Sequence, residues 1–246
     1  MKLKLLRINT SFVATISVAL LSVTIPAIAG NSSIQQLEKK PIDLSVMQSA
    51  ANKGEIQAQL MMGIFHHEGS AGLTKDSAKA FNWYKKAAQA GNQDAQFSLA
   101  SMYESGDGID QNYALAKNWY EKAAAQGDSD SQYVLGSMYY NGTGVAQNYT
   151  TAFNWYQKSA NQGNMAAENN LGDMYRKGEG VAQDVKKAFS WYQKSAEQGY
   201  PKAQYNAAMA YINGIGVKKD SKQGELLLSE YCNGNAAIEC SNVEKT

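Results

Sequence analysis

The sequence has few cysteines and histidines, and its charges nearly cancel. Two cysteines, two histidines and no C-x-x-C motif offer little for a metal or redox centre. Lysine and arginine number 23 against 22 aspartates and glutamates, so the chain lacks the positive charge with which proteins bind nucleic acid. Beyond the first 29 residues, no apolar run reaches the ~18 residues of a membrane helix.

The first 29 residues have the pattern of an export signal. Its three parts are a basic start with Lys2, Lys4 and Arg7, an apolar stretch over residues 12–23, and the cleavage sequence Ala27-Ile28-Ala29. Cleavage after Ala29 predicts a bacterial protein that is periplasmic or secreted; an uncleaved membrane anchor is the alternative. The remaining chain has 20 basic and 22 acidic residues, which argues further against a nucleic-acid partner. We expect no membrane insertion after cleavage.

A tryptophan–tyrosine pair recurs with a fixed period and takes up all four tryptophans of the chain. The tryptophans are Trp83, Trp119, Trp155 and Trp191, so each step is 36 residues. A period of this size indicates stacked supersecondary units, which is a solenoid.

Each unit is predicted to hold two helices. In the first, Ala95, Leu99, Met102 and Tyr103 form one apolar stripe at helical spacing. One step after the leucine comes a small residue, which lets the partner helix approach closely: Gly63, Ala100, Gly136, Gly172 and Ala208. A G-x-G then ends the helix, because glycine adopts positive φ without a Cβ clash. A phosphate-binding role for this G-x-G is disfavoured, since no strand precedes it and it occurs four times.

The second helix begins at a residue of a strong N-cap type and ends at glycine. The caps, spaced by 36, are Asp76, Asn112, Asn148, Asp184 and Asp220. The glycines that end the helix are Gly91, Gly127, Gly163 and Gly199. We expect the tryptophan between them to be buried between units, so that its truncation to alanine costs roughly 3–5 kcal/mol. The lysine of W-Y-x-K repeats too regularly to encode a partner and is expected to be solvated or to favour the helix C-terminus.

The combined pattern A-Q-x-x-L-G-x-M-Y-x-x-G-x-G-V, then N/D-x-x-x-A-x-x-W-Y-x-K-A-A-x-Q-G, resembles the SEL-1-like repeat, a relative of the tetratricopeptide repeat. The resemblance implies an all-α fold, an α/α solenoid in which about five 36-residue helix-turn-helix repeats stack into a right-handed superhelix. It also implies a protein–protein scaffold, with no catalysis and no cofactor. Residues 30–41 are polar and are expected to form a flexible leader. The resemblance implies that residues 42–246 form the solenoid with its terminal caps.

The two ends of the solenoid depart from the pattern. Residues 47–54 match the end of a second helix and are expected to form a half-unit cap. His66 stands where later units have tyrosine, so we expect it in a core position. The last unit has Leu227-Leu228 in place of the tryptophan–tyrosine pair.

Of the two cysteines, Cys232 falls at the end of the second helix of this last unit, and Cys240 falls at a first-helix position that would follow it. Continuing the register places them across a turn, so in an oxidising compartment a disulfide is expected, worth roughly 2–3 kcal/mol. The same C-x7-C arrangement is similar to that of the cysteine-rich branch of the family. Metal binding or redox catalysis is the alternative.

Catalytic motifs are scarce. His66 and His67 are adjacent and therefore point about 100° apart on a helix, which disfavours a shared zinc ion. There is no H-E-x-x-H and no G-x-S-x-G. The cysteine-rich branch implies penicillin binding or weak β-lactam hydrolysis, but S-x-x-K followed by K-T-G is missing here.

The partner-binding candidates are positions that vary between units. Offsets of 0, 1, 4 and 7 along the first helix lie on one face, distinct from the packing stripe. If the first helices line a concave groove, as the resemblance implies, this face is the groove, with an apolar N-terminal end and a polar middle. The candidates are Phe97, Tyr133, Tyr140, Asn169, Asn170, Asp173, Arg176, Tyr205, Met209 and Ile212. The aromatic residues at the first offset have a second interpretation, packing between units.

Four functions remain. The first is a non-catalytic periplasmic scaffold or adaptor that binds a peptide or domain of an envelope protein. The second is an immunity protein that neutralises a secreted antibacterial effector of the lipase type. The others are a secreted factor acting at a host surface and a weak β-lactam hydrolase.

Overall fold

The computed structural model describes residues 43–234, which contain eleven helices and no strand. The predicted signal peptide (1–29) and leader (30–41) lie outside these residues. A short helix, α3 (Leu44–Asn52), precedes five helix pairs. The first helices of the pairs are α4 (Ile56–Glu68), α6 (Gln93–Ser105), α8 (Ser129–Asn141), α10 (Met165–Lys177) and α12 (Pro201–Asn213). The second helices are α5 (Ser77–Gln89), α7 (Tyr113–Ala125), α9 (Tyr149–Ala160), α11 (Val185–Glu197) and α13 (Ser221–Gly234).

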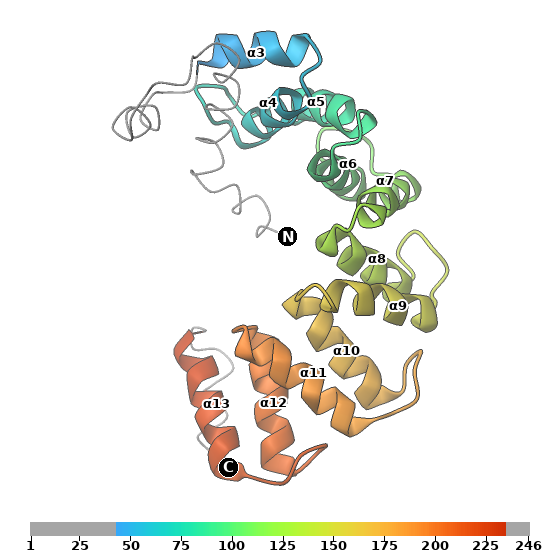
Figure 1. Cartoon of the computed structure of the whole chain (residues 1–246), viewed down its shortest axis with the longest axis vertical. Coiled ribbons are helices and arrows are strands. Elements are labelled where there is room, and N and C mark those ends of the chain that lie inside the picture. The colour runs from blue at the N-terminus through green and yellow to red at the C-terminus, as the bar shows by residue number, and fades with distance from the viewer. Residues whose placement is uncertain (1–42, 235–246) are drawn as a thin grey trace, which may run out of the picture.

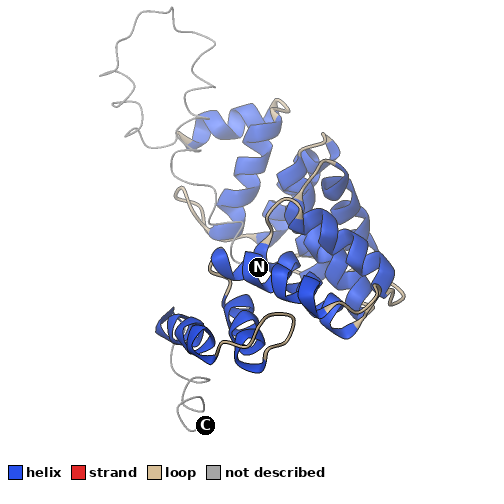
Figure 2. Ribbon diagram, turned by 60° about the horizontal axis from the view of Figure 1, so that its bottom comes forward, coloured by secondary structure: helices blue, strands red, loops and turns tan. Residues whose placement is uncertain are grey.

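The pairs stack in sequence order along an arc (Figure 1). Each second helix packs against the first helix of its own repeat, and α5, α7, α9 and α11 also pack against the first helix of the next repeat. The turned view shows helices joined by short loops throughout this part of the chain (Figure 2). The predicted all-α solenoid of five repeats is confirmed, and α3 packs on α4 in the position of the predicted half-unit cap.

The helix boundaries follow the predicted caps. Asp76, Asn112 and Asn148 each accept a hydrogen bond from the backbone N–H three residues later, at 2.9 Å. Asp184 and Asp220 do the same for the last two repeats, at 3.0 Å. These side chains satisfy one of the free N–H groups that every helix start exposes.

The buried aromatic residue of each repeat is the tyrosine, and the prediction that the tryptophan is buried is wrong. Tyr84, Tyr120, Tyr156 and Tyr192 are at most 3% exposed, whereas the four tryptophans are half-buried. The predicted small residue explains how a tyrosine fits between two helices. A Cβ added to Gly136 would lie 2.5 Å from Cδ1 of Tyr156, and Gly63 and Gly172 meet Tyr84 and Tyr192 in the same way.

Each G-x-G loop joins the two helices of its own repeat and touches the start of the second helix in the preceding repeat, which predicts a matched pair of glycine mutants. Gly180 has φ +71° and abuts the backbone of Tyr149, whereas Gly199 has φ +82° with open space around it. Gly199→Ala should therefore cost only the left-handed backbone conformation, about 1 kcal/mol. Gly180→Ala adds overlap with backbone atoms and should cost at least about 2 kcal/mol. Urea unfolding of the two variants measures both, and equal losses would contradict the proposed contact.

Candidate interaction face on the first helices

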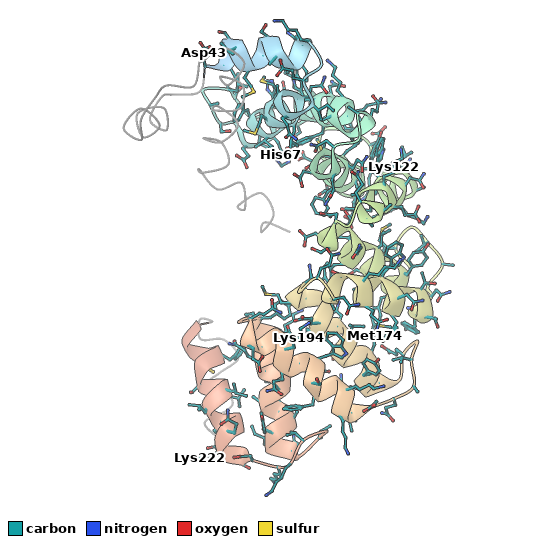
Figure 3. All side chains as sticks on the ribbon, viewed as in Figure 1. Asp43, His67, Lys122, Met174, Lys194 and Lys222 are labelled. Carbon is teal, nitrogen blue, oxygen red and sulfur yellow. The ribbon has the colours of Figure 1, made fainter. Side chains whose placement is uncertain are left out.

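The variable face consists of the residues equivalent to Phe97, Ser98, Ser101 and Glu104 on each first helix. In Figure 1, α4, α6 and α8 lie nearer the hollow side of the arc than α5, α7 and α9. Figure 3 places His67, a member of this face, on the hollow side, and Lys122 of a second helix on the outer side. In the first three repeats, the first helices therefore line the hollow side of the arc.

Two aromatic residues of the variable face, Phe97 and Tyr133, pack against the buried tyrosine of their own repeat. The rings of Phe97 and Tyr120 stand edge-on with centroids 5.6 Å apart, and those of Tyr133 and Tyr156 are tilted at 5.8 Å. Phe97 and Tyr133 are half-buried. They therefore support the core with one ring face and keep part of their surface open.

The hydroxyl of each buried tyrosine reaches the variable face. Burial raises the pKa of Tyr156 to about 12, opposed by hydrogen bonds that its hydroxyl makes with Ser137 and Asn170. Tyr120 donates to Glu104 Oε2 at 2.6 Å, and burial again raises the pKa of this tyrosine. These hydroxyls stay neutral near pH 7 and help to fix the polar side chains around them.

The fourth repeat carries the polar part of the face. Tyr192 donates to Asp173 Oδ1 at 2.8 Å, and Arg176 Nε donates to the Tyr192 hydroxyl at 3.2 Å. Arg176 Nη2 also lies 3.3 Å from Asp173 Oδ1, and its side chain is 47% exposed. The hydrogen bond with Tyr192 is the main cause that raises the pKa of Arg176. The guanidinium is thus held in place on an open surface.

Tyr140 links the third and fourth repeats. Its hydroxyl donates to Glu179 Oε2 at 2.7 Å and accepts from Lys177 Nζ at 3.0 Å. Its ring lies 5.2 Å from that of Tyr149 and is half-buried. Tyr140 and the Asp173–Arg176 pair therefore stand on consecutive first helices as ordered, partly open side chains.

Two parts of the predicted face are buried and therefore cannot contact a partner. Asn169 is only 3% exposed, and its side-chain oxygen accepts a hydrogen bond from Asn206 at 2.9 Å, so it joins repeats four and five. The first repeat contributes Leu60, Met61 and Ile64, all at most 5% exposed, in the same apolar cluster as Met47 of α3. The expected apolar N-terminal end of the groove is therefore core rather than surface.

The last repeat contributes both open and closed residues. Tyr205 is 42% exposed and its ring lies 6.1 Å from that of Tyr231. Ile212 and Met209 are half-buried. Ile212 packs against α13, where a Cβ added to Gly224 would lie 2.6 Å from its Cγ1. Tyr205 is the most open of the aromatic candidates.

The histidines take separate roles. His66 is 8% exposed, as expected for a residue in a tyrosine position, and burial lowers its pKa. His67 Nε2 lies 3.0 Å from Asp107 Oδ2, and the pKa of Asp107 is lowered, chiefly by a hydrogen bond with Ser77. Within residues 43–234, no three acidic, histidine or cysteine side chains are placed to hold a metal ion.

The repeated lysine stacks on the repeated tryptophan. Lys86, Lys122 and Lys158 place Nζ at 4.2, 3.7 and 4.3 Å from the ring centroids of Trp83, Trp119 and Trp155. A lysine three residues after a tryptophan on a helix was a usable signal for this contact, because such residues lie side by side.

Two further expectations concern the disulfide at the C-terminal end and the relation of the chain to a membrane. Cys232 lies in α13, but Cys240 lies outside the described residues, so the disulfide between them stays a prediction. In the part of the chain that the structure describes, no helix has the length and apolar character needed to span a membrane.

Five stacked helix pairs with one variable face define a tetratricopeptide-like α/α repeat protein. The Sel1 repeat model matches residues 56–92, 93–128, 129–164, 166–200 and 201–230. The chain belongs to the Sel1 repeat family. Repeats of this family mediate protein–protein interaction and are generally non-catalytic scaffolds.

Solved structures share the fold. A protective antigen of uropathogenic Escherichia coli with an SLR fold is 36% identical, with a TM-score of 0.76 over 78% of this chain and 41% of that one. A Sel1 repeat protein from Oxalobacter formigenes is 31% identical, with a TM-score of 0.69 over 79% and 85%. The immunity protein PA5088 from Pseudomonas aeruginosa is 18% identical, with a TM-score of 0.53 over 94% and 86%, which shows the fold alone.

The chain spans only part of some relatives. It covers less than half of the Escherichia coli antigen. A stretch of 64 residues is 34% identical to the ERAD-associated E3 ubiquitin-protein ligase component HRD3A of Arabidopsis thaliana, which is 26% of this chain and 9% of that protein.

Proposed function

We propose that this chain is a non-catalytic interaction scaffold of the bacterial periplasm that binds a partner protein on its variable face. The observation that supports this most is a contrast between two sets of positions. Core positions repeat almost unchanged, as with Tyr84, Tyr120 and Tyr156. Positions on the variable face change in size, polarity and charge from one repeat to the next.

The open, ordered side chains of repeats three to five are the proposed contact area. Tyr140 and Arg176 are fixed by hydrogen bonds before any partner binds, so little side-chain entropy is lost on association. Tyrosine and arginine are also the side chains that most often dominate binding energy at interfaces. Tyr205 extends the area toward the end of the arc.

The periplasmic location rests on the predicted signal peptide. Fractionation of cells that express a C-terminally tagged chain tests it, with N-terminal sequencing of the product. We expect a chain that begins at Gly30 in the periplasmic fraction. A full-length chain in the cytoplasmic fraction would remove the location from the proposal, and a chain found chiefly in the medium would favour a host-directed role.

Capture from periplasmic extract tests the contact area. The wild type is compared with a Tyr140→Ala, Arg176→Ala variant, and with a control variant, Asn118→Ala and Asn154→Ala, exposed on the second helices. A partner retained by the wild type and the control should bind the first variant at least about 10-fold more weakly, as expected for lost hot spots. Equal retention by all three proteins would move the contact area away from the variable face.

The captured partner also separates the candidate roles. An envelope protein supports the scaffold, whereas a secreted lipase that loses activity in the complex assigns the immunity role. Hydrolysis of a β-lactam by the purified chain would overturn the non-catalytic part of the proposal.

A further inference from the structure

Five lysines gather at one edge of the last two repeats. Lys186 and Lys187 lie in the first turn of α11, Lys218 and Lys219 in the α12–α13 loop, and Lys222 in the first turn of α13. The loop touches the start of α11, because Gly216 abuts the backbone of Val185. The two segments therefore form one surface, here called the basic edge. Figure 3 places Lys222 at the lower end of the arc, away from α3.

The fold does not require these lysines, since at least one other repeat places an uncharged residue at each position, although the first repeat also has lysines, Lys75 and Lys79, at the positions of Lys219 and Lys187. The position of Lys219 is held by glutamine in the three preceding repeats. Gln111, Gln147 and Gln183 donate to the carbonyl oxygens of Glu104, Tyr140 and Arg176 at 2.7, 2.8 and 2.8 Å. Lys218 stands where Ala146 and Ala182 occur, and Lys186 stands where Thr150 occurs. The last repeat has thus exchanged a loop-bracing side chain for charge.

The placement of the charge is unfavourable for the isolated helices. The N-terminus of a helix has partial positive charge, so lysines in the first turn are repelled by it. The nearby Asp184 and Asp220 accept backbone hydrogen bonds as N-caps, and Asp184 lies 3.7 Å from Lys187. Within the described chain, Lys186, Lys218, Lys219 and Lys222 have no carboxylate within 4.0 Å. The surface therefore has uncompensated positive charge to offer an external anion.

Apolar side chains stand among these lysines. Val185 is 37% exposed and Ile215 is 45% exposed. Exposed apolar side chains surrounded by lysine are typical of surfaces that lie at a membrane interface, where the lysines face phosphate groups. An acidic protein segment would be recognised by the lysines alone and gives no role to Val185 and Ile215.

We propose that the basic edge binds the surface of a membrane rich in anionic phospholipid, without insertion of any helix. The lysines contact lipid phosphates, and Val185 and Ile215 contact the boundary of the acyl region. This contact uses the loop edge of the last two repeats and leaves Tyr140 and Arg176 on the variable face free for a protein partner.

Cosedimentation with vesicles tests the proposal on the full chain. Vesicles of phosphatidylcholine with one-third phosphatidylglycerol are compared with phosphatidylcholine alone. The test variant, Lys186→Thr, Lys218→Ala and Lys219→Gln, has residues that other repeats carry at the same positions, so it should fold. The control variant removes the same charge elsewhere with Lys79→Thr, Lys85→Gln and Lys202→Ala, again residues taken from other repeats. All proteins share the same N-terminal segment, so any binding by that segment is common to them.

We expect the wild type and the control to bind the anionic vesicles, with a partition coefficient that falls as salt is raised. The test variant should bind on the order of 100-fold more weakly, since each lysine at an anionic surface is worth roughly a factor of five. Equal binding by the test and control variants would overturn the proposal. So would binding to a poly-glutamate peptide without binding to vesicles, which would assign the basic edge to an acidic protein.

Discussion

Replacement of Tyr120 by alanine is expected to lower the free energy of unfolding by about 3–5 kcal/mol, the range for a large aromatic residue in a core. Tyr120 is 0% exposed, and its ring packs against Phe97 while its hydroxyl donates to Glu104. Truncation leaves a cavity between α6 and α7 and removes the partner of a carboxylate. Urea unfolding followed by circular dichroism measures the loss.

The neighbouring Trp119→Ala is the matched control. The tryptophan is half-buried and lies under Lys122, so its truncation should cost about 1–2 kcal/mol, less than the loss at Tyr120. A larger loss for Trp119→Ala than for Tyr120→Ala would show that the tryptophan carries the core after all. Because contacts in a stack run only between neighbours, both losses should appear first in the unfolding of repeats two and three.

The tryptophan–tyrosine pair shows what the sequence can and cannot decide. Its period of 36 predicts the number of repeats, their length and their two helices. The period alone does not say which of two adjacent aromatic residues faces the core. The alanines do: Ala116, Ala123 and Ala124 lie three or four residues from Tyr120, and all three are buried. The buried alanines thus indicate which side of the helix faces the core, and they place the tyrosine there instead of the tryptophan.

Local features were predictable because short segments determine them. The N-caps depend on one side chain and a backbone N–H three residues away, and all five form as expected. Accessibility on the variable face depends on neighbouring repeats. Asn169 is covered because Asn206 of the next repeat reaches it, whereas Tyr205 at the equivalent position of the next repeat stays open. No pattern within one repeat distinguishes these two cases.

Replacement of Lys194 by alanine is expected to destabilise the fold by about 3 kcal/mol, far more than the same change at the equivalent lysines. The reason is a buried carboxylate. Glu168 in α10 is 0% exposed, its Oε1 lies 2.9 Å from Lys194 Nζ, and its Oε2 accepts from Gln198 at 2.6 Å. Oε1 accepts no well-directed hydrogen bond within the described chain. Lys194 therefore stabilises the Glu168 carboxylate by its positive charge. Removal of one partner of a buried ion pair leaves the other charge buried without compensation, which destabilises the fold.

The other repeats show that this ion pair is an exception to the pattern. Gln59, Gln96 and Gln132 stand at the equivalent position, and each donates from Nε2 to a backbone carbonyl of the preceding helix at 3.2 Å. A carboxylate has no such donor. Lys194 also lies 5.2 Å from the Trp191 ring, whereas its equivalents lie within 4.3 Å of theirs. It stands farther from the tryptophan while it contacts Glu168.

A double-mutant cycle separates the ion pair from the packing of the lysine on the tryptophan. Glu168→Gln restores the residue of the other repeats and should be neutral or slightly stabilising, since a buried ion pair gives little net stability. In that background Lys194→Ala should cost less than 1 kcal/mol, the same as the matched Lys158→Ala in the third repeat. The coupling energy from urea unfolding should therefore be about 2 kcal/mol. If Lys194→Ala cost the same in both backgrounds, the charge on Glu168 would be stabilised by its surroundings without Lys194.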